Sequence, residues 1–246
     1  MLRFSFEHHG LKFSCLDAGG CGQALIALHA HWMEGQTFAS LATALAPEWR
    51  VIAPDQRGHG DSDHAPTYAR SDYLDDLLGL VDHLGLRQAM LLGNSLGGVN
   101  AYQFAARYPE RVRALIIEDI GAVIADDTSF ALAWSGIFET RGDLEERIGP
   151  RFLPYLQDAI RSVPAGWHLA FDPCELAASQ ESLNGNHWKD WLATDCLRFF
   201  CVGSKAGSPR NSTWKKWQPG DPVRCSGIWK AAMSFTLITP PDSVQR

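Results

Sequence analysis

The sequence has no long apolar run, no paired-cysteine motif and no excess of positive charge. No stretch of its 246 residues approaches the ~20 consecutive apolar residues that a membrane-spanning helix needs, so we expect no membrane partner. The six cysteines show neither a C-x-x-C pair nor a metal-site spacing, which predicts free thiols and neither a metal nor another cofactor. A net charge of −6 argues against nucleic acid as a partner. The N-terminal stretch lacks the apolar segment of a signal peptide, and we therefore expect a cytoplasmic protein.

Histidine is absent from the C-terminal part of the sequence. The nine histidines stand at positions 8, 9, 29, 31, 59, 64, 83, 168 and 187, which excludes a catalytic histidine from residues 188–246 as the sequence is written. Residues 197–246 carry eight of the 22 basic side chains but only two of the 28 acidic ones. The sign of the charge and the apolar periodicity therefore both change near Cys196.

The residues before this change alternate between short apolar runs and amphipathic stretches. Residues 2–7 and 12–16 alternate around His9-Gly10 and predict a hairpin. Continuous apolar runs are typical of strands buried on both faces, and they occur at residues 24–28, 50–54, 89–92 and 112–117. Helical periodicity follows at residues 36–45, 71–84 and 99–108, the second helix being capped by Ser71-Asp72. The pattern predicts an α/β fold with a mostly parallel sheet covered by helices on both faces.

A G-x-S-x-G motif spans Gly93-Asn94-Ser95-Leu96-Gly97, between a predicted buried strand and a predicted helix. This context is that of a nucleophile elbow, a sharp turn that exposes a serine hydroxyl in front of the amino end of a helix. Glycines are needed there because bulky neighbours do not fit a strained turn. The alternative for the motif alone is an ordinary turn of small residues between a strand and a helix.

Four segments in order resemble α/β-hydrolases of the esterase, lactonase and non-haem haloperoxidase-like kind. They are LHAHW, PDQRGHGDS, GNSLGG and YPERVRALIIED, and the resemblance covers roughly residues 2–120. It implies a hydrolase core over residues 1–121, a Trp- and Phe-rich helical lid over residues 122–190 and a core strand over residues 191–202. Residues 203–246 depart from the family, and there we expect an incomplete or disordered, poorly ordered tail.

The resemblance also implies roles for individual residues. Ser95 matches the nucleophile, and the backbone N–H groups of His31 and Leu96 match the oxyanion hole. Asp119 is our choice for the acid of the triad, with Glu118 as the fallback, because the residues after the 196–202 strand hold no nearby carboxylate. The substrate pocket is expected to include Trp32, Asn94 and Trp134. No residue is assigned to a metal.

Two further loop features follow from the resemblance. His29 matches a histidine that fixes the loop carrying His31, and Ala30 stands where the family usually has glycine. The charged loop 55–62 is expected to be structural, with Asp55 and Arg57 forming a buried ion pair and turn.

The base of the triad is missing, because the chain order Ser–Asp–His needs a histidine near the C-terminus. Either the tail is a true basic extension, or residues 197–246 come from a shifted reading frame, which we favour. Reading from the third base of each codon fixes Glu at Trp229-Lys230 and permits Glu-Gly-Gly-His-Val-Val-His-Phe-Asp from there. That stretch resembles the family's segment with the catalytic histidine.

The sequence therefore predicts a serine hydrolase acting on a small carboxylic ester or lactone. The alternative is a catalytically impaired protein of the same fold that binds a small molecule. The elbow serine favours the enzyme, and the missing histidine favours the binding protein.

Overall fold

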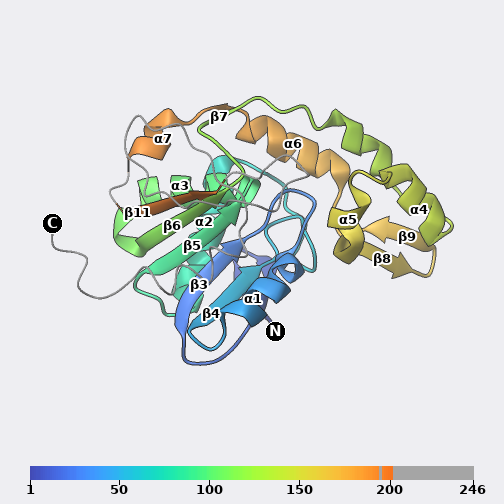
Figure 1. Cartoon of the computed structure of the whole chain (residues 1–246). Helices are drawn as coiled ribbons and strands as arrows, with labels where there is room; N and C mark the ends of the chain where they lie inside the picture. Colours follow the sequence, from blue (N-terminus) through green and yellow to red (C-terminus); the bar gives the residue numbers. More distant parts are fainter. Residues whose placement is uncertain (194–195, 202–246) are drawn as a thin grey trace, which may run out of the picture.

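The computed structural model describes residues 1–193 and 196–201, which form a central sheet between layers of helices (Figure 1). The described strands pair in the order β1-β2-β4-β3-β5-β6-β11. They are β1 (Leu2–His8), β2 (Leu11–Asp17), β3 (Gln23–Leu28), β4 (Trp49–Pro54), β5 (Ala89–Asn94), β6 (Val112–Glu118) and β11 (Leu197–Cys201). The strands from β4 to β11 are parallel, whereas β1 and β2 form an antiparallel hairpin and β2 pairs antiparallel with β4. The predicted mostly parallel sheet is confirmed.

Helices pack on both faces of the sheet because its strands carry apolar side chains on both sides. The helix α1 (Ala39–Leu45) covers one face, where Leu41 joins Met90 and Leu92 in a buried cluster. The helices α2 (Arg70–His83) and α3 (Leu96–Arg107) cover the other face, where Leu91 lies in the larger cluster. Successive residues of β5 thus point to opposite faces, as the pleat of a strand requires.

The helix α2 begins at Arg70, so the predicted cap at Ser71 is wrong. The cap position is Ala69, whose backbone N–H donates to the Asp72 carboxylate at 3.1 Å. Thr67 Oγ1 donates to the same carboxylate at 2.7 Å. Asp72 therefore lies at the third helical position, where a carboxylate satisfies free N–H groups of the first turn.

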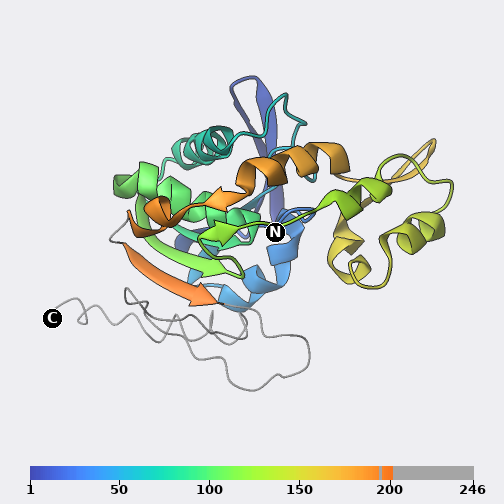
Figure 2. The ribbon, with the colours of Figure 1, turned by 90° about the horizontal axis from the view of Figure 1, so that it is seen from above.

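Between β6 and β11 the chain leaves the sheet and builds the expected lid, which is mostly helical. Its elements are β7 (Val123–Ile124), a 3-10 turn (Ser129–Trp134), α4 (Arg141–Ile148), α5 (Leu153–Leu156), a 3-10 turn (Gln157–Ala159), β8 (Ile160–Val163), β9 (Gly166–Leu169), α6 (Pro173–Leu183), β10 (Gly185–Asn186) and α7 (Trp188–Leu192). Figure 2 shows α4, α5 and the β8–β9 hairpin beside the sheet, with α6 returning over it. The aromatic side chains of the lid divide: Trp134 and Trp191 are buried, but Phe130, Tyr155 and Trp188 are exposed.

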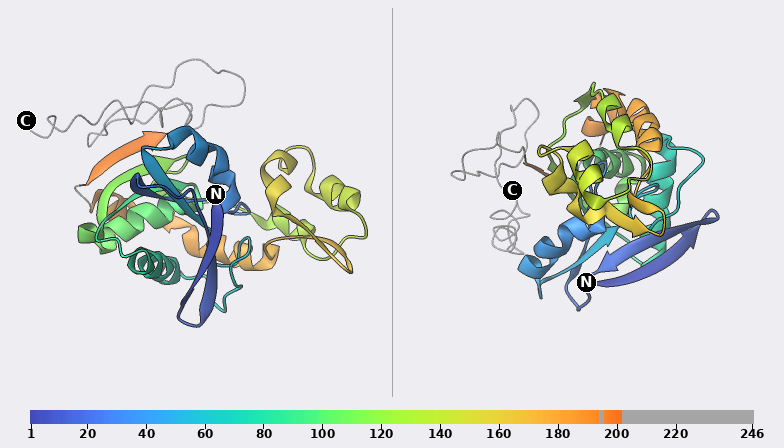
Figure 3. Two further views of the ribbon diagram at one scale, coloured as in Figure 1. Left: turned by 90° about the horizontal axis from the view of Figure 1, so that it is seen from below. Right: turned by 90° about the vertical axis from the view of Figure 1, so that its right-hand side faces the viewer.

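Three further expectations concerned the N-terminal hairpin, membrane-spanning helices and the C-terminal tail. The β1–β2 hairpin, dark blue in Figure 3, extends away from the body of the sheet. The helices of the described residues include none that is both long enough and apolar enough to cross a membrane. The tail expected over residues 203–246 lies outside the described residues.

Candidate active site

Ser95 occupies a strained turn between β5 and α3. Its φ of 49° and ψ of −112° lie in a region that residues with a side chain rarely adopt. The Ser95 N–H donates to the carbonyl of Glu118 at 2.9 Å, and the Ser95 carbonyl accepts from Val99 N–H at 3.1 Å. Because hydrogen bonds hold both sides of the serine, the turn is fixed in this conformation, and the residue remains partly exposed.

The glycines of the motif permit this turn by allowing close backbone approach. A Cβ atom on Gly97 would collide with the carbonyl oxygen of Leu28, and one on Gly93 would collide with the carbonyl oxygen of Gly97. A Cβ atom on Gly98 would lie 2.6 Å from the Ile120 Cγ2 methyl. The spacing of the motif is therefore explained by packing of the elbow against β3 and β6.

The two backbone N–H groups expected to form the oxyanion hole belong to Leu96 and His31. Leu96 is the first residue of α3, so its N–H has no partner within the helix. His31 follows β3, and the pairing of Leu28 with Gly93 brings the end of β3 beside the elbow. Both donors thus belong to segments that leave the carboxyl edge of the sheet, where ligands bind in open α/β sheets.

The His31 side chain has a structural role beneath the lid. Its Nε2 lies 2.9 Å from Ser179 Oγ of α6, and that hydroxyl lies 2.8 Å from the Tyr73 hydroxyl of α2. Burial lowers the pKa of His31 well below its usual range, and the neighbouring His59 and Arg70 lower it further. The imidazole is therefore neutral and ties the loop after β3 to the lid.

Trp32 links that loop to the aromatic side chains of the lid. Its φ is 68°, and its ring stands edge-on to Phe130, Trp134 and Phe152 at centroid distances of 5.6, 5.5 and 6.0 Å. These four rings form an aromatic cluster at the lid. The expected pocket residues Trp32 and Trp134 are thus in contact, whereas the third, Asn94, hydrogen-bonds Glu118 across the sheet.

Asp119 and Glu118, the two candidates for the acid, have different environments. Asp119 is exposed and leaves β6 with a φ of 52°. Glu118 is half-buried, and burial raises its pKa to about 7 against the opposing hydrogen bond from Asn94, with the Asp119 charge raising it further. A carboxyl group that is partly protonated at neutral pH orients a histidine poorly, which favours Asp119 for that role.

The nine histidines make their contacts with residues other than Ser95. His29, His31 and His59 form a buried cluster, with the His59 ring 4.9 Å from that of His29 and 6.1 Å from that of His31. The other six contact Asp75 (His8, His9), Glu175 (His64), Phe4 and Phe6 (His83), the β8 strand (His168) and Leu183 with Gln103 (His187). None of the nine hydrogen-bonds Ser95 in the part of the chain that the structure describes.

Hydrogen bonds of His29 hold the loop after β3 against the loop after β4, as the resemblance implied. His29 Nε2 accepts the backbone N–H of Gln56 at 2.9 Å, and the Gln56 side chain donates to the His29 carbonyl at 2.7 Å. Burial lowers the pKa of His29 to about 4, so the ring is neutral and can accept this hydrogen bond.

The predicted ion pair between Asp55 and Arg57 is wrong. Asp55 instead pairs with Arg3 of β1 at 2.6 Å and accepts the Gly35 N–H at 2.8 Å. Arg57 pairs with Asp76 of α2 at 2.6 Å. The two neighbours point to opposite sides of the loop, which ties it to β1 on one side and to α2 on the other.

A buried polar cluster beside α3 escaped the sequence analysis. Arg70 donates to Gln103 at 3.0 Å and to Asn100, and its guanidinium lies 5.1 Å from the Tyr73 ring. Burial lowers the pKa of Arg70 to about 10. Its Nη1 has no hydrogen-bond partner among residues 1–193 and 196–201. The first residue of an amphipathic helix gave no sign of burial, although the polar side chains at 100 and 103 on an otherwise apolar helix were a signal.

A family model described as the alpha/beta hydrolase fold matches residues 18–212. Among curated proteins, 2-(acetamidomethylene)succinate hydrolase of Mesorhizobium japonicum is 35% identical over 148 residues, which are 58% of this chain and 53% of that protein. An sn-1-specific diacylglycerol lipase of Mus musculus is 36% identical over 115 residues, 46% of this chain and 38% of that protein. The chain thus spans about half the length, or less, of these relatives.

Solved structures resemble the chain in fold. The crystal structure of E-2-(acetamidomethylene)succinate hydrolase superposes with a TM-score of 0.74 and 24% identity, covering 82% of this chain and 80% of that one. A thioesterase domain from the curacin biosynthetic pathway superposes with a TM-score of 0.72 and 18% identity, covering 96% and 99%. At these identities the likeness shows a shared fold and nothing finer.

Proposed function

Because this chain belongs to the α/β-hydrolase fold family, we propose that it is a serine hydrolase that cleaves a small carboxylic ester or lactone. Ser95 is the nucleophile in this proposal. The observation that carries it is the backbone of Ser95, whose φ of 49° and ψ of −112° place the residue at a sharp turn before α3. A conformation that unfavourable persists only where the surrounding structure enforces it, and such positions cluster at functional sites.

The proposed reaction begins with attack of Ser95 Oγ on the acyl carbon of the substrate. The carbonyl oxygen becomes an oxyanion, which the N–H groups of His31 and Leu96 stabilise, each donor lowering the barrier by about 3 kcal/mol. The positive end of α3 adds to this field. Collapse of the intermediate expels the alcohol and leaves an acyl-enzyme, which water then cleaves to release the acid and restore the serine hydroxyl.

A base must accept the proton of Ser95, and Asp119 is proposed to orient that base. The base itself is expected in the segment after residue 201, if that segment is read in the frame that supplies a histidine. Residues 202–246 lie outside the described residues, so this assignment rests on the sequence alone.

The substrate is proposed to carry an apolar acyl group. Support comes from the aromatic cluster of Trp32, Phe130, Trp134 and Phe152, which lies next to the loop that holds His31. Aromatic side chains of this kind offer an apolar surface that suits hydrocarbon rather than charge. Asn94, at the end of β5, would supply a polar contact beside the nucleophile.

One observation favours a second candidate, a catalytically impaired protein that binds a small molecule under the lid. None of the nine histidines hydrogen-bonds Ser95 within the described residues, so its hydroxyl has no visible base. Without a base the serine would remain a weak nucleophile.

A fluorophosphonate probe distinguishes the two candidates. The probe reacts with activated serines, so the proposed enzyme should be labelled at Ser95, and Ser95→Ala should abolish labelling while leaving the fold intact. A panel of p-nitrophenyl esters of increasing chain length then tests the acyl preference. If the protein is unlabelled and inactive but is stabilised by unreacted esters, the binding role is correct. Full activity in Ser95→Ala would exclude the proposed mechanism.

A further inference from the structure

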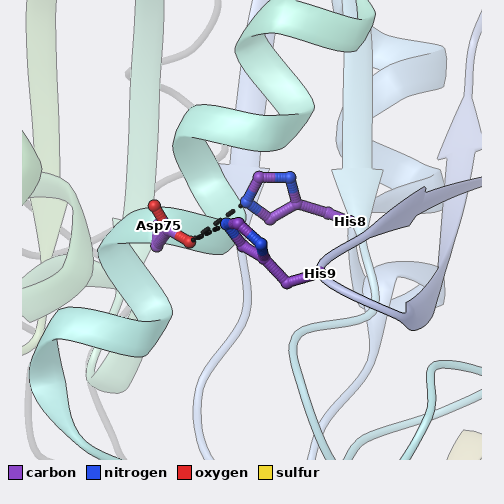
Figure 4. A group of neighbouring side chains, drawn as sticks. All are labelled: His8, His9 and Asp75. Carbon is purple, nitrogen blue, oxygen red and sulfur yellow. Dashed lines mark hydrogen bonds and ion pairs between the residues drawn. The ribbon is translucent and has the colours of Figure 1, made fainter.

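We propose that His8, His9 and Asp75 form a binding site for a divalent transition-metal ion such as Zn²⁺, between the β1–β2 turn and α2. Figure 4 shows both imidazole rings directed at the Asp75 carboxylate. His8 ends β1, His9 lies in the turn, and Asp75 comes from the second turn of α2. The site lies outside the candidate active site and does not depend on the proposed function.

The ligand atoms already converge. His8 Nε2 lies 3.1 Å and His9 Nε2 lies 2.9 Å from the same oxygen, Asp75 Oδ2, and the three candidate ligand atoms lie within 4.8 Å of one another. Around a tetrahedral ion with bonds of about 2.0–2.1 Å, neighbouring ligand atoms are about 3.3 Å apart. The two separations between histidine and carboxylate approach this value, and the two imidazole nitrogens lie within 4.8 Å of each other, so the three donor atoms are already grouped as an ion requires.

The backbone of the turn aims His9 at the helix. His9 has a φ of 48° and Gly10 a φ of 78°, the arrangement of a two-residue type I′ hairpin turn. The first position of that turn is usually Asn, Asp or Gly, because other residues are strained there. A histidine in this position sacrifices turn stability, which is expected where the side chain itself has a function.

Space for the second ring comes from a glycine inside α2. A Cβ atom on Gly79 would lie 2.6 Å from His8 Cγ and 2.7 Å from His8 Nδ1, so no larger residue fits beside the ring. Gly79 is one turn beyond Asp75 and therefore faces the same side of the helix. Glycine within a helix is less stable than alanine, and here that loss of stability allows His8 to lie against the helix next to the carboxylate.

The donor set selects the class of ion. Two imidazole nitrogens and one carboxylate oxygen suit Zn²⁺, Cu²⁺, Ni²⁺ or Co²⁺, whereas Mg²⁺ and Ca²⁺ prefer oxygen ligands. The His9 side chain is 72% exposed and that of Asp75 is 42% exposed, so a solvent molecule can complete the coordination. The site uses no cysteine, so it does not conflict with the absence of a metal-site spacing among the cysteines. The ion would cross-link the N-terminal hairpin to α2.

Metal binding is tested by isothermal titration of the full, tag-free protein with Zn²⁺ after chelator treatment and removal of the chelator. We expect saturable binding of one ion per chain and a rise in the thermal midpoint. Loss of a residue that merely orients a ligand typically weakens binding by about 10–100-fold. The variants His9→Gln and Asp75→Asn, which each lose a ligand, should therefore bind at least roughly tenfold more weakly. Mg²⁺ at the same concentration should give no heat.

His64→Gln provides the matched control. His64 is also exposed and also contacts a carboxylate, Glu175, at 2.6 Å, but no second histidine joins this pair. Its Zn²⁺ affinity should equal that of the parent protein. Absence of saturable binding in a folded protein overturns the proposal. So does binding that is unchanged in both His9→Gln and Asp75→Asn, because the ion is then held elsewhere.

Discussion

Ser95 and Asp119 occupy matching positions at the ends of two adjacent parallel strands, and both have a left-handed backbone. Ser95 follows β5 with a φ of 49°, and Asp119 follows β6 with a φ of 52°. The residues just before them, Asn94 and Glu118, are paired in register. Such conformations cost about 1–3 kcal/mol at each residue. Two such residues side by side indicate that this edge of the sheet keeps an unfavourable backbone geometry at the expense of stability.

The strain at Ser95 predicts an unusual order of stability between two variants. Ser95→Gly should unfold at a higher urea concentration than Ser95→Ala, with a difference of about 1 kcal/mol, because glycine adopts a positive φ without steric cost. Both variants lack the hydroxyl, so the comparison isolates the backbone.

Ser135 is the control for this comparison, since it is exposed and has an ordinary φ of −68° and ψ of 146°. There the glycine variant should be the less stable of the two. The same order at both positions would mean that Ser95 is not strained.

The close approach of the elbow to β3 predicts that Gly97→Ala is destabilising. The added methyl group would collide with the Leu28 carbonyl, and neither backbone can retreat without disturbing the sheet. Overpacking of this kind costs about 1–3 kcal/mol. Chemical denaturation measures the loss directly.

Gly142→Ala is the matched control for Gly97→Ala. Gly142 lies in α4, is exposed, and a Cβ atom there would be 3.6 Å from its nearest neighbour, Thr140 Oγ1. Alanine should raise stability at this position by about 0.5–1 kcal/mol. A Gly97→Ala protein as stable as its parent would show that the elbow tolerates a side chain.

The elbow and the sheet were predictable from sequence because their signals are local. Glycine spacing at Gly93 and Gly97 and the apolar run before them are sufficient to indicate a strand, a turn and a helix. The partners of charged residues were not predictable in this way. Asp55 and Arg57 are two residues apart, but one pairs with Arg3 and the other with Asp76, because the loop between them turns its side chains to opposite sides.

Burial of polar groups was the other feature that the sequence concealed. Arg70 lies just before the predicted helix, and nothing in the sequence indicated that its guanidinium would donate to Asn100 and Gln103 of α3. His31 was assigned through its backbone N–H, and nothing in the sequence indicated that its ring would meet Ser179, since 148 residues separate the two. Contacts of this kind depend on where the lid returns over the sheet, and they follow only from the tertiary structure.

The two acid candidates are separated by Asp119→Asn and Glu118→Gln. If Asp119 orients the catalytic histidine, its amide variant should lower kcat by about 10⁴-fold, as loss of this role does in other triads. Glu118→Gln should leave kcat nearly unchanged, because glutamine can keep the hydrogen bond with Asn94. The measurement requires a form of the protein that turns over esters. A rate unaffected by Asp119→Asn would transfer the role to Glu118 or to the region after Val202.

Because its pKa is raised, Glu118 also makes the stability of the protein depend on pH, and Glu118→Gln tests this dependence. Burial raises its pKa to about 7, above its value in the unfolded chain, so the stability it contributes is complete in acid and is lost as the pH rises through 7. Glu118→Gln has no proton to lose. Its stability relative to the parent should therefore increase between pH 5 and pH 8 in urea titrations. A constant difference across this range would mean that the carboxyl group is not buried as described.

The buried histidines predict the opposite dependence, and His59 offers the clearest test. Burial lowers the pKa of His59 well below its usual range, with His29 lowering it further, and its Nε2 has no hydrogen-bond partner within the described chain. Its folded-state pKa is depressed, so the stability that it contributes is present above about pH 6.5, the value in the unfolded chain, and falls as the pH drops below it.

His59→Leu removes the titrating group together with the hydrogen bond between Nδ1 and the Arg57 carbonyl. We therefore expect the variant to be less stable than the parent at pH 7.5, and this deficit to shrink steadily as the pH is lowered to 5. Urea unfolding at four or five pH values measures both, and a deficit that stays constant or widens in acid would show that His59 is charged in the folded protein.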